Sequence, residues 1–178
     1  MLYLFGFHRI GVVLSDLYFV DPNPNPGQEG AERGVRLEVR LLEQPAHEGT
    51  IYASRPIVID QPVWRADLLE SVSGPPGSFD RTHHHPGMRG WEPGSRKFEP
   101  DLSSDPLGWL AQRLSDLDGL LTEAGLDSAA VDPRDASDLR RAVPEIVDCA
   151  RRLLDGVHAG ELAAPPTEAV AAARVGWL

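Results

Sequence analysis

Apolar and polar residues alternate along the first part of the chain, and this alternation predicts β-strands. The clearest example is residues 35–43, where apolar residues at the odd positions are separated by Arg36, Glu38 and Arg40. Successive side chains of a strand point to opposite faces, so this segment has one face for a core and one for water. Residues 50–59 follow after a turn, and we expect the two segments to pair as an antiparallel hairpin.

Two further segments of the first part have strand-like patterns. Residues 1–20 contain two apolar runs separated by His8 and Arg9, which predicts one or two strands. Residues 63–69 alternate in the same way, and the alternation favours a strand over a short helical turn. Residues 21–27 contain three prolines, which lack amide donors and restrict the residue before each of them, so an exposed loop is expected there.

The last part of the chain has apolar residues at the three- and four-residue spacing that is typical of helices. Asp105 followed by Pro106 predicts a helix start and Gly125 predicts a helix end, so we expect one helix over residues 106–124.

A second apolar stripe extends over residues 139–157 and predicts another helix. Pro144 lies inside it and is expected either to kink the helix or to mark its start, because proline cannot donate an intrahelical hydrogen bond. Facing stripes predict an antiparallel helical hairpin. Residues 167–175 are rich in alanine and predict a short further helix.

These patterns predict an α+β fold. The expected architecture is an N-terminal antiparallel β-sheet or small sandwich followed by a C-terminal helical hairpin. The length of 178 residues fits one domain over residues 1–178. Within it we distinguish a β-rich part (1–73), a long loop (74–98) and a helical part (99–178).

Composition and charge narrow the classes of function. Hydrophobic residues make up 42% of the chain and charged residues 25%, which is typical of a globular protein. The formal net charge of −10 argues against nucleic acid and anionic membranes as partners. A single cysteine, Cys149, cannot form an internal disulfide, and we expect a reducing, cytoplasmic location. No apolar run reaches the roughly 18 residues of a membrane span.

The loop at 74–98 is the one positively charged segment. It carries 4 basic and 2 acidic residues, a net charge of +2, whereas residues 1–73 have a net charge of −4 and residues 99–178 a net charge of −8. Loops of this length without periodicity are usually either functional or mobile. We therefore expect candidate binding or catalytic residues in this loop.

Metal binding is the sharpest hypothesis for the loop. In an extended backbone His83 and His85 fall on one face while His84 points away, so two imidazoles could reach one divalent metal ion. Asp80 or Glu92 could supply an oxygen ligand, and open coordination positions would suit catalysis. The alternative is that the histidines are polar residues of a solvated loop, or that one of them caps a backbone carbonyl.

Anion recognition is the second hypothesis for the loop. Arg81, Arg89 and Arg96, with Trp91 among them, could bind a carboxylate or phosphate and stack a planar ring. The alternative is that these cations, with Lys97, pair with the acidic helical part.

Three functional hypotheses follow. The first is a small acidic binding or accessory protein in the cytoplasm that presents residues 74–98 to a protein partner or a small anionic ligand. The second is a small metal-dependent enzyme, of hydrolase or oxygenase type, with a metal site at His83 and His85. The third is a structural subunit whose loop orders on assembly. An uncovered sheet face or edge would also allow a homodimer.

Overall fold

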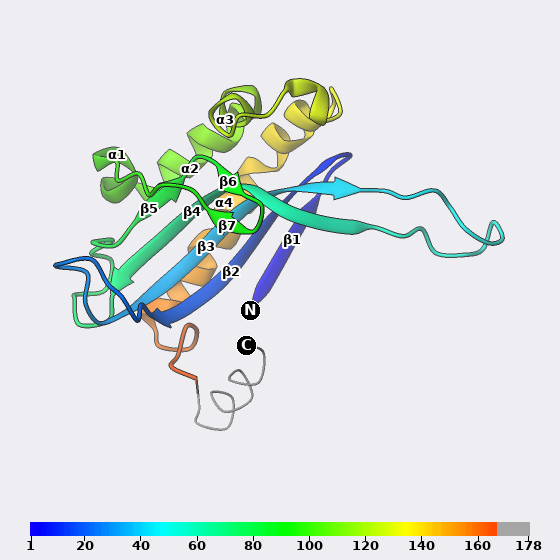
Figure 1. The fold of residues 1–178 in the computed structure, drawn as a ribbon. Coiled ribbons are helices and arrows are strands. Elements are labelled where there is room, and N and C mark those ends of the chain that lie inside the picture. The colour runs from blue at the N-terminus through cyan, green and yellow to red at the C-terminus, as the bar shows by residue number, and fades with distance from the viewer. Residues whose placement is uncertain (167–178) are drawn as a thin grey trace.

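The computed structural model describes residues 1–166 (Figure 1). The helix expected over residues 167–175 lies outside the described residues. The first half of the chain forms one five-stranded antiparallel sheet in which every strand pairs with the next one along the chain. Its strands are β1 (Leu2–Gly6), β2 (Ile10–Val20), β3 (Ala31–Glu43), β4 (Val58–Ser71) and β5 (His83–His85). The predicted order of an N-terminal antiparallel sheet followed by helices is confirmed.

The central hairpin differs from the one expected. β3 pairs with β4 over a register in which Glu32 lies opposite Ser71 and Glu43 opposite Val58. The strand expected over residues 63–69 is therefore part of β4. Residues 50–59, the expected partner, lie mostly in a long loop over residues 44–57, so that expectation is wrong. The loop carries two prolines, which cannot donate to a strand ladder.

The helical part contains four α-helices and one short 3₁₀ turn in the described residues. They are α1 (Pro100–Ser104), α2 (Pro106–Ser115), α3 (Leu117–Glu123), the 3₁₀ turn Ser128–Ala130 and α4 (Asp135–His158). The expected start at Pro106 is confirmed, and the Asp105 side chain accepts a hydrogen bond from the backbone N–H of Gly108. The single helix expected over 106–124 is wrong, because Asp116 leaves the helical conformation and caps α3 by accepting from Gly119 N.

α4 begins nine residues before Pro144, so this proline lies inside the helix and does not mark its start. The buried side of α4 packs on β2 and β3 and against α2, which places the helices on one face of the sheet (Figure 1). Apolar residues of β2, β3, β4 and the helices form one core there. Cys149 is fully buried within α4. No helix of residues 1–166 is both long and apolar enough to cross a membrane.

The segment at 74–98 is not the irregular loop that its composition predicts. It contains β5 and a small hairpin of β6 (Met88–Arg89) and β7 (Glu92–Pro93), which lies in front of β4 on the face opposite α4 (Figure 1). Hydrogen bonds between the backbones of His84 and Lys97, at 3.0 and 2.8 Å, fix the end of this hairpin to β5. The hairpin therefore covers part of β4 on the face opposite the helices.

Candidate metal centre

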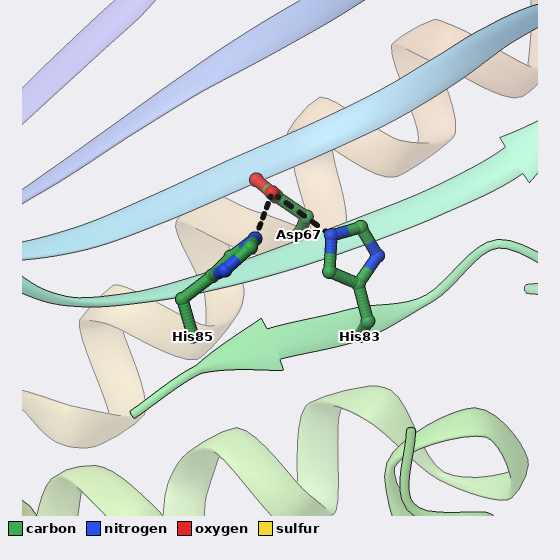
Figure 2. A group of neighbouring side chains, drawn as sticks. All are labelled: Asp67, His83 and His85. Atoms are coloured by element: carbon green, nitrogen blue, oxygen red, sulfur yellow. Dashed lines mark ion pairs between the residues drawn. The ribbon is translucent and has the colours of Figure 1, made fainter. Parts of the chain in front are cut away.

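The pairing of β5 with β4 decides which side chains meet. His83 lies opposite Asp67, and His85 lies opposite Arg65. Because side chains alternate between the faces of a strand, His83 and His85 share the face of Asp67, as the sequence predicts for the two histidines. Figure 2 shows both imidazoles directed toward the Asp67 carboxylate. All three side chains are buried, with 1–3% of each residue exposed.

His83 has an acceptor on each side of its ring. Its Nδ1 lies 2.8 Å from the carbonyl oxygen of Arg81, and its Nε2 lies 3.5 Å from Oδ2 of Asp67. Burial lowers the pKa of His83 below its ordinary value, against the opposing effect of Asp67, so the neutral imidazole is favoured. A neutral imidazole has one N–H, and the shorter contact assigns it to Nδ1. Nε2 then directs a lone pair at the carboxylate.

His85 is held in the same way. Its Nδ1 lies 2.8 Å from the carbonyl oxygen of Gly94, in the segment that follows β7. Its Nε2 lies 3.0 Å from Nη2 of Arg65 and 3.7 Å from Oδ2 of Asp67. Since a guanidinium only donates, Nε2 must be the acceptor and Nδ1 carries the proton. Burial lowers the pKa of His85 to about 4, which keeps this imidazole neutral.

Asp67 is ionised between two arginines. Arg36 Nε donates to Oδ1 at 2.7 Å, and Arg65 Nε lies 3.0 Å from Oδ2. Burial alone would raise the pKa of Asp67, but the charges of Arg36 and Arg65 outweigh it and hold the pKa below its usual value. Arg36 thus fixes the carboxylate through Oδ1, while both histidines approach Oδ2.

These three side chains could together hold a metal ion. Asp67, His83 and His85 form the one group of three metal-ligating side chains that the described residues bring together, with their ligand atoms within 4.8 Å of one another. Ligands of a tetrahedral zinc ion lie about 3.3 Å apart, since each bond is about 2.0–2.1 Å. The contacts of 3.5 and 3.7 Å to Oδ2 are close to that separation. Carbonyl acceptors on the far ring nitrogens are the usual support of histidine ligands.

His84 lies on the other face of β5, as expected. It is fully buried, with ring centroids 5.0 Å from Trp109 and 6.0 Å from Trp64. Its Nε2 donates to Oε1 of Glu99 at 2.9 Å, and the indole N–H of Trp109 donates to the other oxygen of Glu99 at 3.0 Å. This histidine links the sheet to the helices.

The two carboxylates proposed from the sequence as metal ligands are not in the group. Asp80 accepts hydrogen bonds from the Ser71 backbone N–H at 2.8 Å and from Ser78 Oγ at 2.9 Å, which fixes the connection between β4 and β5. Glu92 is exposed on β7. Asp67 takes the place that the sequence analysis gave to Asp80 or Glu92.

Two of the residues proposed for anion recognition bind the same loop, and the other two are exposed. Arg81 donates to the carbonyl oxygen of Gly27, and Arg96 donates to Gln28 at 3.0 Å, so both hold the proline-rich loop against this face. Arg89 is exposed. Trp91 is 65% exposed and lies beneath Arg40 at 5.6 Å.

Lys97 forms an ion pair with Glu123 of α3 at 2.9 Å, which is the pairing with the acidic helical part considered as the alternative. Anion binding by the other four residues stays a prediction.

Asp67 was missed because it precedes the histidines by 16 residues and belongs to a different strand. One signal could have found it. Trp64, Ala66 and Leu68 alternate with Arg65 and Asp67, and this alternation gives the second face of the same strand two opposite charges. Pairing of this strand with residues 83–85 would then have brought a carboxylate to the histidines.

Comparison of the chain with protein-family models, with curated proteins and with solved structures found no match.

Proposed function

We propose that the protein binds one divalent transition-metal ion through Nε2 of His83, Nε2 of His85 and Oδ2 of Asp67. Two imidazoles and one carboxylate are borderline ligands that suit zinc, iron, cobalt or manganese more than calcium or magnesium. Three protein ligands leave coordination positions for water or a substrate oxygen, which is the arrangement that metal-dependent hydrolases and oxygenases use.

One observation carries this proposal. Both imidazoles donate their Nδ1 protons to backbone carbonyls, of Arg81 and of Gly94, and both place Nε2 near the same carboxylate oxygen of Asp67, at 3.5 and 3.7 Å. The lone pair of His83 and the charge of Asp67 repel each other unless a cation lies between them. Histidines of a solvated loop would instead be exposed, whereas these are buried and oriented.

Metal content of untagged protein tests the proposal. We expect about one ion per chain by elemental analysis, or uptake of one Zn²⁺ or Co²⁺ by protein stripped with a chelator. Addition of the ion at 100 times its Kd should stabilise the native state by about 2.7 kcal/mol, which raises Tm by about 5–10 °C.

Matched variants identify the ligands. His83→Ala/His85→Ala should lose both the ion and the rise in Tm, whereas His47→Ala, which removes an exposed imidazole from the 44–57 loop, should keep both. Asp67→Asn should weaken uptake, and Glu92→Gln should not. Folded protein that takes up none of the transition metals, or that loses the ion in the His47 variant equally, would refute the site.

One observation supports the accessory-protein hypothesis: the indole of Trp91, in the hairpin of β6 and β7, is exposed. Exposed tryptophan is common at binding surfaces. Capture of a partner that is lost in Trp91→Ala, with metal content unchanged, would support it.

A further inference from the structure

We infer that Arg65 competes with the metal ion for its ligands: the guanidinium contacts the ligand atoms of His85 and Asp67 and must move aside, toward Glu38, when an ion binds. This inference rests on the proposed metal site. It assigns Arg65 the role of setting how tightly the site holds an ion and leaves Arg36 as the residue that positions Asp67.

Arg65 contacts two of the three ligand atoms. Its Nη2 lies 3.0 Å from Nε2 of His85, on the lone pair that an ion would use. Its Nε lies 3.0 Å from Oδ2 of Asp67, the oxygen that both histidines approach. A guanidinium and a divalent cation are attracted by the same lone pairs, so both cannot occupy them together.

Arg65 makes few hydrogen bonds to the site. The contact with His85 is the single hydrogen bond of its guanidinium within the described residues. Its Nε is buried without a hydrogen-bond partner, because the contact with Asp67 is out of line with the N–H. By contrast, Arg36 reaches the carboxylate with aligned donors, at 2.7 Å to Oδ1 and 3.4 Å to Oδ2. Asp67 therefore keeps one aligned arginine when the other leaves.

Glu38 offers Arg65 a second partner. It lies directly opposite Arg65 in the register of β3 and β4, so their Cβ atoms are about 4.5–5.5 Å apart and on the same face. Glu38 now accepts from Arg40, which also donates to the carbonyl oxygen of Asp60 at 3.0 Å and lies over Trp91. Arg40 thus has other contacts and can share Glu38.

The experiment compares the affinity of chelator-stripped protein for Co²⁺ and Zn²⁺ by titration, with the Co²⁺ absorption spectrum as a second readout of ligand type. Arg65→Met removes the charge and the donors but keeps an unbranched apolar stem in a buried position. We expect it to bind the ion about 10–100-fold more tightly than the wild type, the range over which groups around metal ligands change affinity. Arg65→Lys keeps the positive charge but loses the planar guanidinium donors. Its affinity for the ion should lie between those of the wild type and Arg65→Met.

Two controls separate competition from a general effect on the fold. Arg33→Met also removes a guanidinium from a buried carboxylate, Glu70, but on the helix-covered side of the sheet, and should leave the affinity unchanged. Glu38→Gln should weaken metal binding in the wild type, because Arg65 loses the carboxylate with which it would pair when the ion binds. In the Arg65→Met background Glu38→Gln should have no effect, because there is no arginine to pair with residue 38.

The possible outcomes test the competitor role of Arg65 separately from the existence of the metal site. If the wild type binds through Asp67, His83 and His85 but Arg65→Met binds equally well or less well, the competitor role is overturned and the site stands. If Arg65→Met binds and the wild type does not, the role is supported, provided that His83→Ala/His85→Ala abolishes binding in that background. If neither protein takes up an ion, both the site and the competitor role are refuted.

Discussion

His84 and its neighbours His83 and His85 are identical side chains on one three-residue strand, yet the two faces of β5 give them different surroundings. On the helix-covered face His84 packs against Trp64 and Trp109 and donates to Glu99. On the opposite face His83 and His85 meet a carboxylate and a guanidinium beneath the β6–β7 hairpin. Burial is the same, but the partners differ.

This difference shows how burial alone fails to define a function. His84 has one donor placed on an acceptor, its Nδ1 is buried without a hydrogen-bond partner, and its ring packs beside two stacked indoles, which is a packing role. His83 and His85 have their donors placed on carbonyls and their lone pairs placed toward one point. What sets His83 and His85 apart is that both Nε2 atoms lie beside one carboxylate oxygen, Oδ2 of Asp67, at 3.5 and 3.7 Å.

The largest expected effect on stability comes from removing His84 from the helix-covered face of β5. His84→Ala leaves a cavity beside the stacked rings of Trp64 and Trp109 and removes the donor to Glu99, which should lower the free energy of unfolding by about 2–4 kcal/mol. For a chain of this length the corresponding fall in Tm is about 5–15 °C. Thermal unfolding followed by circular dichroism measures it.

Metal uptake by folded His84→Ala, measured at low temperature, tests whether the two faces of β5 have separate roles. His84→Ala should still bind one ion, whereas His83→Ala should lose the ion. Loss of metal binding in folded His84→Ala would contradict the division of roles between the two faces.

A second expected effect is on the pH dependence of stability in the metal-free protein. The pKa of His85 is about 4 in the folded protein because the residue is buried, with Arg65 adding to this effect and Gly94 O, Asp67 and His83 also facing the ring. The ordinary value is 6.5. Between these values the unfolded chain binds a proton that the folded protein does not, so stability falls as the pH falls from about 6.5 to about 4. The full effect of this one group is on the order of 3 kcal/mol.

Urea unfolding at several pH values with a chelator present measures this dependence. His85→Gln should make the decline in stability between pH 6.5 and 4 shallower, by up to one bound proton per molecule. An unchanged slope in His85→Gln would show that this imidazole is not held neutral by its surroundings.

The strands with alternating residues were predictable because one of their faces is apolar. Residues 35–43 and 63–69 show this pattern, and both lie in strands of the sheet. The break of the helix at Asp116 was not predicted, because Leu114, Leu117 and Leu121 continue the helical spacing across it. The capping pattern Asp-x-x-Gly, which occurs at both Asp105 and Asp116, was the available signal.

Two of the three candidate ligands were predictable from local geometry, since His83 and His85 share a face of any extended segment. The third ligand depends on which strand lies beside residues 83–85, and three histidines carry no apolar pattern that would specify a neighbour. The backbone carbonyls of Arg81 and Gly94 that orient the rings are likewise invisible in the sequence, because every residue has one.

The smallest expected effect concerns Glu99, the acceptor that connects His84 to the helices. Glu99→Ala removes the acceptor of the His84 and Trp109 hydrogen bonds, but its side chain is 38% exposed, so water can replace part of the interaction. We expect a loss of about 1–2 kcal/mol by urea unfolding, against less than about 0.5 kcal/mol for Glu92→Ala on the outer hairpin. Neither variant should change metal uptake, because neither residue faces the converging lone pairs. A loss of metal binding in Glu99→Ala would mean that the two faces of β5 are coupled through the strand, and the separation of packing and metal-binding roles would then have to be abandoned.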